Sequence, residues 1–140
     1  MKIPNIRSRN FSLDEVIHYQ GEITQEVLLY GMYRMGRLQA IRDYLCLKHD
    51  RDIRLKVHSG WRSEWYNSSL PGASDESYHI WRITEKGLLI TASDISSPDL
   101  NLDQLMEDVA AFTKGETYQH KRFGFVHEAD FGRDEEWIVY

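Results

Sequence analysis

Residues 58–95 read HSGWRSEWYNSSLPGASDESYHIWRITEKGLLITASDI, and this stretch decides the fold that the chain is expected to adopt. Its second half contains two apolar runs, 79–84 and 88–95, which meet at Glu85-Lys86-Gly87. A glycine-containing turn between two apolar runs is typical of a β-hairpin. Its first half, 59–77, is rich in Gly, Ser and Asn and is predicted to form a long loop. The sequence therefore predicts a long loop that leads directly into a pair of strands.

Two helices are predicted before this stretch. Ser12 begins a capping box and is expected to start a short helix. Thr24 is expected to open a longer helix that continues to about Lys48, with apolar residues at helical spacing. Gly31 and Gly36 lie inside this longer helix, where glycine is unfavourable. We interpret them as positions of close packing against another element.

A strand, a helix and two further strands complete the pattern. Residues 53–58 alternate between apolar and polar, as in a half-buried strand. Asn101 is expected to cap a helix that ends at Gly115, and strands are expected at 122–127 and 135–140. Helices followed by strands, one helix and strands again indicate the α+β class, with an antiparallel sheet partly covered by helices.

Length and composition limit what the chain can be. Its 140 residues are expected to form a single domain, 1–140. Cys46 is the only cysteine, so an internal disulfide is impossible. The net charge of −5 and the scattered basic residues argue against a nucleic-acid partner. No apolar run is long enough to span a bilayer, so membrane insertion is not expected.

The first residues, Met1-Lys2-Ile3-Pro4-Asn5, lack the apolar core of a signal peptide. The chain is therefore expected to be synthesised in the cytoplasm. A target outside the membrane would require another route of delivery.

Three residues from separate segments form a candidate metal site: His79, Asp94 and His127. Each lies at or near an apolar strand segment, where a rigid scaffold can aim its side chain. Two imidazoles and a carboxylate suit zinc better than magnesium or calcium, which prefer more oxygen ligands. A catalytic zinc has three protein ligands and an open position for water. This set predicts a zinc-dependent hydrolase.

Short motifs in the same order resemble those of a known family, the zinc peptidases of the D-alanyl-D-alanine carboxypeptidase group. This group includes L-alanyl-D-glutamate endopeptidases of bacteria and their phages. The matching motifs are Ser59-Gly60-Trp61-Arg62-Ser63, Tyr66-Asn67, Gly72-Ala73, Ser77-Tyr78-His79, Ala92-Ser93-Asp94-Ile95, Phe125-Val126-His127, Phe131-Gly132 and Trp137.

The resemblance implies a hedgehog/D-Ala-D-Ala-peptidase-like fold, zinc on His79, Asp94 and His127, and cleavage of peptidoglycan stem peptides. It further implies that Arg62 grips a substrate carboxylate with its planar guanidinium. Ser77 would orient its loop or a ligand by hydrogen bonding. A phage or bacterial cell-wall enzyme, associated with a virion or released to the wall, is the corresponding expectation. An equally weighted alternative for Arg62 is a tie from the loop to a backbone carbonyl or to an acid such as Asp75.

The chain departs from the family at the general base, which usually precedes the last histidine by two or three residues. Phe125 and Gly124 occupy those positions, and neither can move a proton. The nearby candidates are Glu128, Asp130, His120 and the Glu135-Glu136 pair, and Asp130 is our choice because a glycine-containing turn follows it.

The interval between His79 and Asp94 is longer than in the family, so residues 81–89 are expected to be an inserted hairpin. Ile90 replaces a family glycine. These departures keep open an alternative function: a catalytically inactive cell-wall-binding or virion structural module on the same fold.

Overall fold

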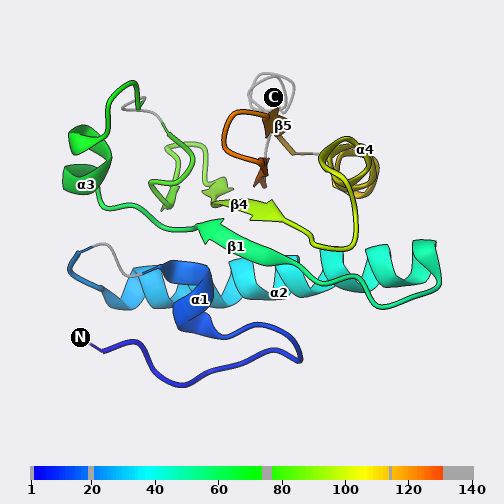
Figure 1. The fold of residues 1–140 in the computed structure, drawn as a ribbon. Helices are drawn as coiled ribbons and strands as arrows, with labels where there is room; N and C mark the ends of the chain where they lie inside the picture. The colour runs from blue at the N-terminus through cyan, green and yellow to red at the C-terminus, as the bar shows by residue number, and fades with distance from the viewer. Residues whose placement is uncertain (1, 19–20, 74–76, 114, 131–140) are drawn as a thin grey trace.

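The structure is a computed structural model that describes residues 2–18, 21–73, 77–113 and 115–130. Helices and an antiparallel sheet of four strands make up the described chain, so the predicted α+β class is confirmed (Figure 1). The sheet has the order β1-β4-β6-β5, and all three neighbouring pairs are antiparallel. Its strands are β1 (Lys56–Ser59), β4 (Ala92–Ser96), β5 (Thr117–His120) and β6 (Phe125–Ala129).

The helices begin where their capping residues predict. Ser12 forms a capping box with Glu15 at the start of α1 (Leu13–Ile17), and Thr24 caps α2 (Gln25–His49). Asn101 accepts a hydrogen bond from the backbone of Gln104 and so caps α4 (Leu102–Phe112). The predicted helix end at Gly115 is wrong, because α4 already ends at Phe112.

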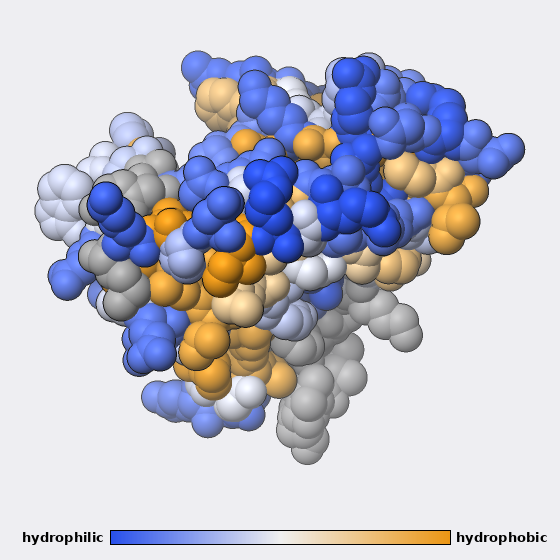
Figure 2. Space-filling view, turned by 90° about the horizontal axis from the view of Figure 1, so that it is seen from below, coloured by the Kyte–Doolittle hydropathy of each residue, from blue (hydrophilic) through white to orange (hydrophobic). Residues whose placement is uncertain are grey.

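The core lies between the sheet and the helices α1, α2 and α4 (Figure 1). Ile95 of β4 and Val126 of β6 are fully buried against Leu38 of α2 and Val109 of α4, among others. Side chains alternate between the two faces of a strand. Asp94 and His127, which adjoin these two residues in the chain, therefore project from the opposite face, which no long helix of the described ranges covers. Seen from below, the helical side of the molecule carries mixed hydrophilic and apolar side chains, with the apolar ones gathered in one area (Figure 2).

The predicted hairpin is present but leaves the main sheet. Its strands are β2 (Arg82–Ile83) and β3 (Leu89–Ile90), and Gly87 takes a φ of +80° in the turn. The chain then returns through Thr91 into β4, so that Asp94 is a sheet residue despite its long interval from His79.

Two short elements were not predicted. The expected loop 59–77 contains the helix α3 (Glu64–Ser69), which begins at its capping residue Ser63. Strand β5 precedes the expected strand at 122–127, which the structure places at β6. The strand expected at 135–140, with the motif residues Phe131-Gly132 and Trp137, lies outside the described residues.

A buried ionic cluster joins α2 to β6 on the helical face of the sheet. The guanidinium of Arg34 is fully buried and pairs with the carboxylates of Glu128 and Asp130. Thr91 accepts a hydrogen bond of 2.8 Å from Arg34 Nε, and Arg37 forms a second ion pair with Glu128. Opposite charges thus compensate one another in an interior where an unpaired charge would be costly.

Candidate metal centre

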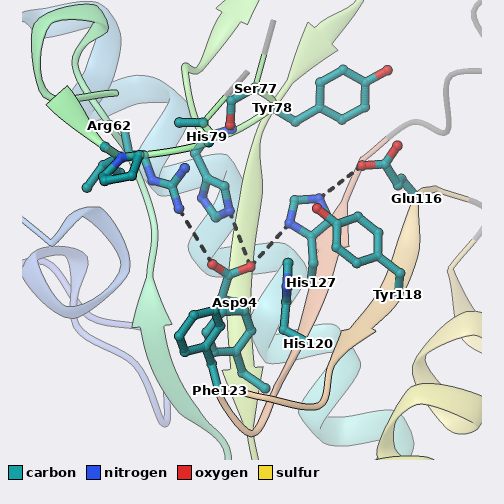
Figure 3. A pocket seen from close by; sticks show the side chains of 15 residues that line it. Arg62, Ser77, Tyr78, His79, Asp94, Glu116, Tyr118, His120, Phe123 and His127 are labelled. Carbon is teal, nitrogen blue, oxygen red and sulfur yellow. Dashed lines mark hydrogen bonds and ion pairs between the residues drawn. The ribbon is translucent and has the colours of Figure 1, made fainter. Parts of the chain in front are cut away.

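His79, Asp94 and His127 converge on one point of the open face of the sheet (Figure 3). His79 Nε2 and His127 Nδ1 each lie 3.2 Å from Asp94 Oδ1. One ligand atom from each residue lies within 4.8 Å of the other two. The three side chains are only 2–3 % exposed. The structure therefore brings together the three residues that the sequence identified as candidate ligands.

Strand register places the carboxylate next to the second imidazole. Asp94 of β4 and His127 of β6 are direct cross-strand partners, so both side chains leave the same face of the sheet. Tyr118 of β5 pairs with His127 from the other side, and their rings stack at 4.4 Å between centroids. The ring of His127 is thus confined between two neighbouring strands.

His79 comes from the loop before the hairpin, and backbone groups hold it. Its Nδ1 lies 2.7 Å from the carbonyl oxygen of Gly60, which leaves Nε2 for Asp94 or for a metal. The backbone N–H of His79 donates to Ser77 Oγ at 3.2 Å, and its carbonyl accepts from Arg62 N at 2.7 Å. Ser77 therefore has the loop-orienting contact that was expected of it.

Gly60 is required where it stands. A Cβ at this position would lie 1.7 Å from the carbonyl oxygen of Val16, at the end of α1. Only glycine allows the chain to pass so close to α1. That close passage aims the Gly60 carbonyl at His79, so this part of the Ser-Gly-Trp-Arg-Ser motif has a direct geometric purpose.

Glu116 is a site residue that sequence reasoning missed. Its Oε1 lies 3.2 Å from His127 Nε2, an ion-pair contact in which the oxygen lies off the axis of the ring N–H. The residue before it, Gly115, passes so close to β6 that a Cβ would lie 1.8 Å from the Ala129 carbonyl oxygen. This glycine was the one available signal, and its pattern pointed instead to a helix end.

The pKa directions of His79 and Asp94 favour the forms that bind a metal, whereas that of His127 favours its protonated form. Burial lowers the pKa of His79, which keeps its imidazole neutral at pH 7. Burial opposes ionisation of Asp94, but its contacts with the rings of His127 and His79 outweigh burial and hold the Asp94 pKa far below its usual range. Burial also acts against the charged form of His127, yet Asp94 and Glu116 together raise its pKa.

The spacing of the donor atoms suits a tetrahedral ion. Donors about 2 Å from a tetrahedral zinc ion are about 3.3 Å apart. Both nitrogen–oxygen distances in the group are 3.2 Å. His79 offers a nitrogen whose ring partner is already held by a carbonyl, as is common for metal-binding histidines. The three donor atoms lie within 4.8 Å of one another, so these residues could hold a metal ion.

A pocket of about 410 Å³ opens over the three residues. Its lining includes Arg62 on one side, Tyr118 on the other, and His120 and Phe123 below Asp94 in the view of Figure 3. Arg62 Nη2 lies 3.9 Å from Asp94 Oδ2, and its Nη1 donates to Asn67 Oδ1 at 3.4 Å. Asp75, the alternative partner proposed for Arg62, lies outside the described residues.

The structure does not bring Asp130 to the pocket. Its carboxylate pairs with Arg34 and accepts from Thr91 on the opposite face of the sheet. Strand alternation explains this placement, because Asp130 follows His127 by three residues and so shares the face of Glu128. The choice of Asp130 as general base therefore needs correction. Among the other candidates, His120 lines the pocket and Glu135-Glu136 lie outside the described residues.

Comparisons with family models, with curated proteins and with solved structures find no match to this chain. None of the helices in the described ranges is long and apolar enough to cross a membrane.

Proposed function

We propose that this domain is a zinc-dependent peptidase that hydrolyses peptide bonds in peptidoglycan stem peptides. The observation that carries the proposal is the convergence of His79, Asp94 and His127 from three segments, in the order in which the peptidase motifs place them. A hedgehog/D-Ala-D-Ala-peptidase-like fold is part of the same proposal. The four-stranded antiparallel sheet, with helices on one face and the site on the other, supports it.

The chain would hold the ion with His79 Nε2, Asp94 Oδ1 and His127 Nδ1. A zinc ion bound there supplies Lewis acidity, which lowers the pKa of a bound water to about 7 and polarises a substrate carbonyl. The pocket walls shield the reacting groups, since all three proposed ligands are buried. The surroundings thus favour hydrolysis at the floor of the pocket.

His120 replaces Asp130 as our candidate for the general base. It lies on β5, two residues from Tyr118, and therefore projects from the same face as the metal centre. Its cross-strand partner is Phe125, which places it diagonally from His127. An imidazole that lines the same pocket could take the proton of a metal-bound water and pass it to the leaving amine.

Arg62 is proposed to bind a carboxylate of the stem peptide. Its guanidinium lines the pocket close to Asp94, on the side opposite Tyr118. Arg62→Lys should weaken binding of a stem peptide in a calorimetric titration, because an ammonium group cannot reproduce a bidentate contact. Equal peptide affinity in Arg62→Lys and Arg62→Ala proteins, compared with wild type, would exclude this role.

The test of the proposal combines metal analysis with cleavage of defined muropeptides. Wild-type protein should bind one zinc ion per chain, and His127→Ala should lose it. His120→Gln should retain zinc but lose about 10²–10⁴-fold in turnover, the usual effect of removing a general base. His49→Gln offers a matched control, since His49 contacts Asp108 at 2.6 Å and does not line the pocket. Zinc content that survives the His79, Asp94 and His127 substitutions would refute the metal assignment.

A second candidate function is a cell-wall-binding or virion module on the same fold that does not cut. The placement of Asp130 on the Arg34 cluster favours it, because the acid first chosen as general base then lies outside the pocket. Stem-peptide binding by zinc-loaded wild type without any cleavage would favour this candidate. Measurable turnover that depends on His120 would exclude it.

A further inference from the structure

We propose that Glu116 is a positioning residue that fixes the ring of His127 with Nδ1 towards the metal centre, an inference that rests on the proposed function. Glu116 Oε1 lies 3.2 Å from His127 Nε2, and Asp94 Oδ1 lies 3.2 Å from Nδ1. The imidazole is 3 % exposed, and one carboxylate lies beside each of its two nitrogens. The two ring nitrogens therefore differ in their surroundings: Nδ1 faces the candidate metal centre, and Nε2 faces Glu116.

The chemistry of imidazole makes the outer contact important. A neutral imidazole carries one N–H, and a nitrogen that binds a metal must be free of its proton. A carboxylate beside Nε2 stabilises the tautomer in which that nitrogen keeps the proton. Nδ1 is then available at the side where His79 and Asp94 lie. Glu116 would thus favour the tautomer in which Nε2 carries the proton and Nδ1 can bind the metal.

The backbone fixes Glu116 in this place. Its carbonyl oxygen accepts from Ala129 N at 2.9 Å, which ties it to β6 two residues beyond His127. Gly115 allows the close approach that this bond requires. A Cβ at this position would lie only 1.8 Å from the Ala129 carbonyl oxygen. The Glu116 side chain is 20 % exposed at the edge of the pocket, and the stacked ring of Tyr118 confines His127 beside it.

His79 shows the same arrangement with a different acceptor. Its Nδ1 is held by the Gly60 carbonyl at 2.7 Å, and its Nε2 faces Asp94. Each histidine therefore has one nitrogen at the centre and the other beside a fixed oxygen. In both cases a glycine with no room for a Cβ brings the oxygen into place.

The experiment is a competition titration of Zn²⁺ against a chelating dye, with wild type, Glu116→Ala, Glu116→Gln and the control Glu107→Ala. Glu107 is an exposed residue of α4 that does not line the pocket. Glu116→Ala should lose about 10–100-fold in zinc affinity. Glu116→Gln should recover most of this loss, because its amide oxygen can still lie beside the Nε2 proton. Glu107→Ala should bind as wild type does.

Nitrogen-15 spectra of the zinc-loaded imidazoles provide a readout that a loss of stability would not imitate. Wild type and Glu116→Gln should show His127 metal-bound at Nδ1 and protonated at Nε2. Equal zinc affinity in wild type and Glu116→Ala would overturn the role of Glu116 while leaving the metal centre intact. Failure of Glu116→Gln to recover affinity would also overturn it, in favour of a purely electrostatic effect. Absence of zinc binding in wild type would overturn the proposed function, and this inference with it.

Discussion

The two glycines beside the site act through the oxygen atoms that they bring close to the histidines. Gly60 is the clearer case, because its own carbonyl contacts His79 Nδ1 at 2.7 Å and a Cβ would meet the Val16 oxygen at 1.7 Å. Relief of that clash must move either α1 or the carbonyl. The residue therefore links the packing of α1 to the orientation of a proposed ligand.

Gly60→Ala is expected to lower the free energy of unfolding by about 1–3 kcal/mol, the range for forced overpacking. Zinc affinity should fall as well, because the displaced carbonyl no longer holds His79. Urea unfolding and a zinc titration measure the two effects. Wild-type values of both would show that the chain absorbs the extra carbon atom without moving the carbonyl.

Because Asp130 lies on the Arg34 cluster and not in the pocket, Asp130→Asn is expected to change stability and to leave activity unchanged. Its carboxylate accepts from Arg34, which is fully buried. Loss of this charge should lower the free energy of unfolding by about 1.5–3 kcal/mol, the range for a hydrogen bond to a charged group. Zinc affinity and turnover per folded molecule should remain unchanged. A variant of normal stability that has lost its turnover would return Asp130 to the list of catalytic groups.

At the scale of elements, α2 contains two glycines, Gly31 and Gly36, for which the sequence predicted the same role. The structure shows that their surroundings differ. A Cβ at Gly31 would lie 2.9 Å from side-chain atoms of Ile17 and Leu13, so close packing against α1 is confirmed there. A Cβ at Gly36 would meet nothing within 4 Å. Packing against another helix thus explains Gly31 and does not explain Gly36.

Gly36→Ala should therefore stabilise the protein by about 0.5–1 kcal/mol, because alanine restricts the unfolded chain and favours the helix. Gly31→Ala makes the same change in helix propensity, but it must also displace α1 and should be destabilising. Thermal unfolding of the two variants under identical conditions gives the comparison. Stabilisation by both would mean that α1 yields to the extra carbon at no cost.

Elements with strong local signals were predictable from the sequence. The short elements α3 and β5 were not. Capping residues and helical spacing predicted α1, α2 and the start of α4. Strand β5 was missed because its residues Thr117–His120 include two that face the pocket, and they give no apolar alternation. Helix α3 was missed because it has only 6 residues, of which Asn67 alone is buried.

The same distinction explains the site. The three candidate ligands were predictable as a set because each lies at or near an apolar strand segment in the sequence. The place of Glu116 in the site could not be predicted. Its contact with His127 depends on the pairing of β5 with β6, which no local sequence pattern predicts. Asp130 was misplaced for a related reason: without the strand bounds, its face of the sheet was unknown.

At the scale of the whole molecule, the proposed metal centre joins segments that are far apart in the chain. His79 belongs to the loop before the hairpin, while Asp94 and His127 belong to the two central strands of the sheet. An ion bound to all three would connect the loop to the sheet only in the folded state. Metal binding and folding stability should therefore be linked.

Zinc is expected to stabilise the wild-type protein by about 2.7 kcal/mol when its free concentration is 100 times the dissociation constant. The measurement is thermal unfolding with and without zinc, with His127→Ala as the variant that should show no zinc effect.

The zinc affinity is also expected to depend on pH, and the direction of this dependence can be predicted. Asp94 and Glu116 raise the pKa of His127, and the proton on Nδ1 competes with the metal. Zinc affinity should therefore fall as the pH drops through that raised pKa, while zinc stabilisation that stays constant across this range would place the ion elsewhere.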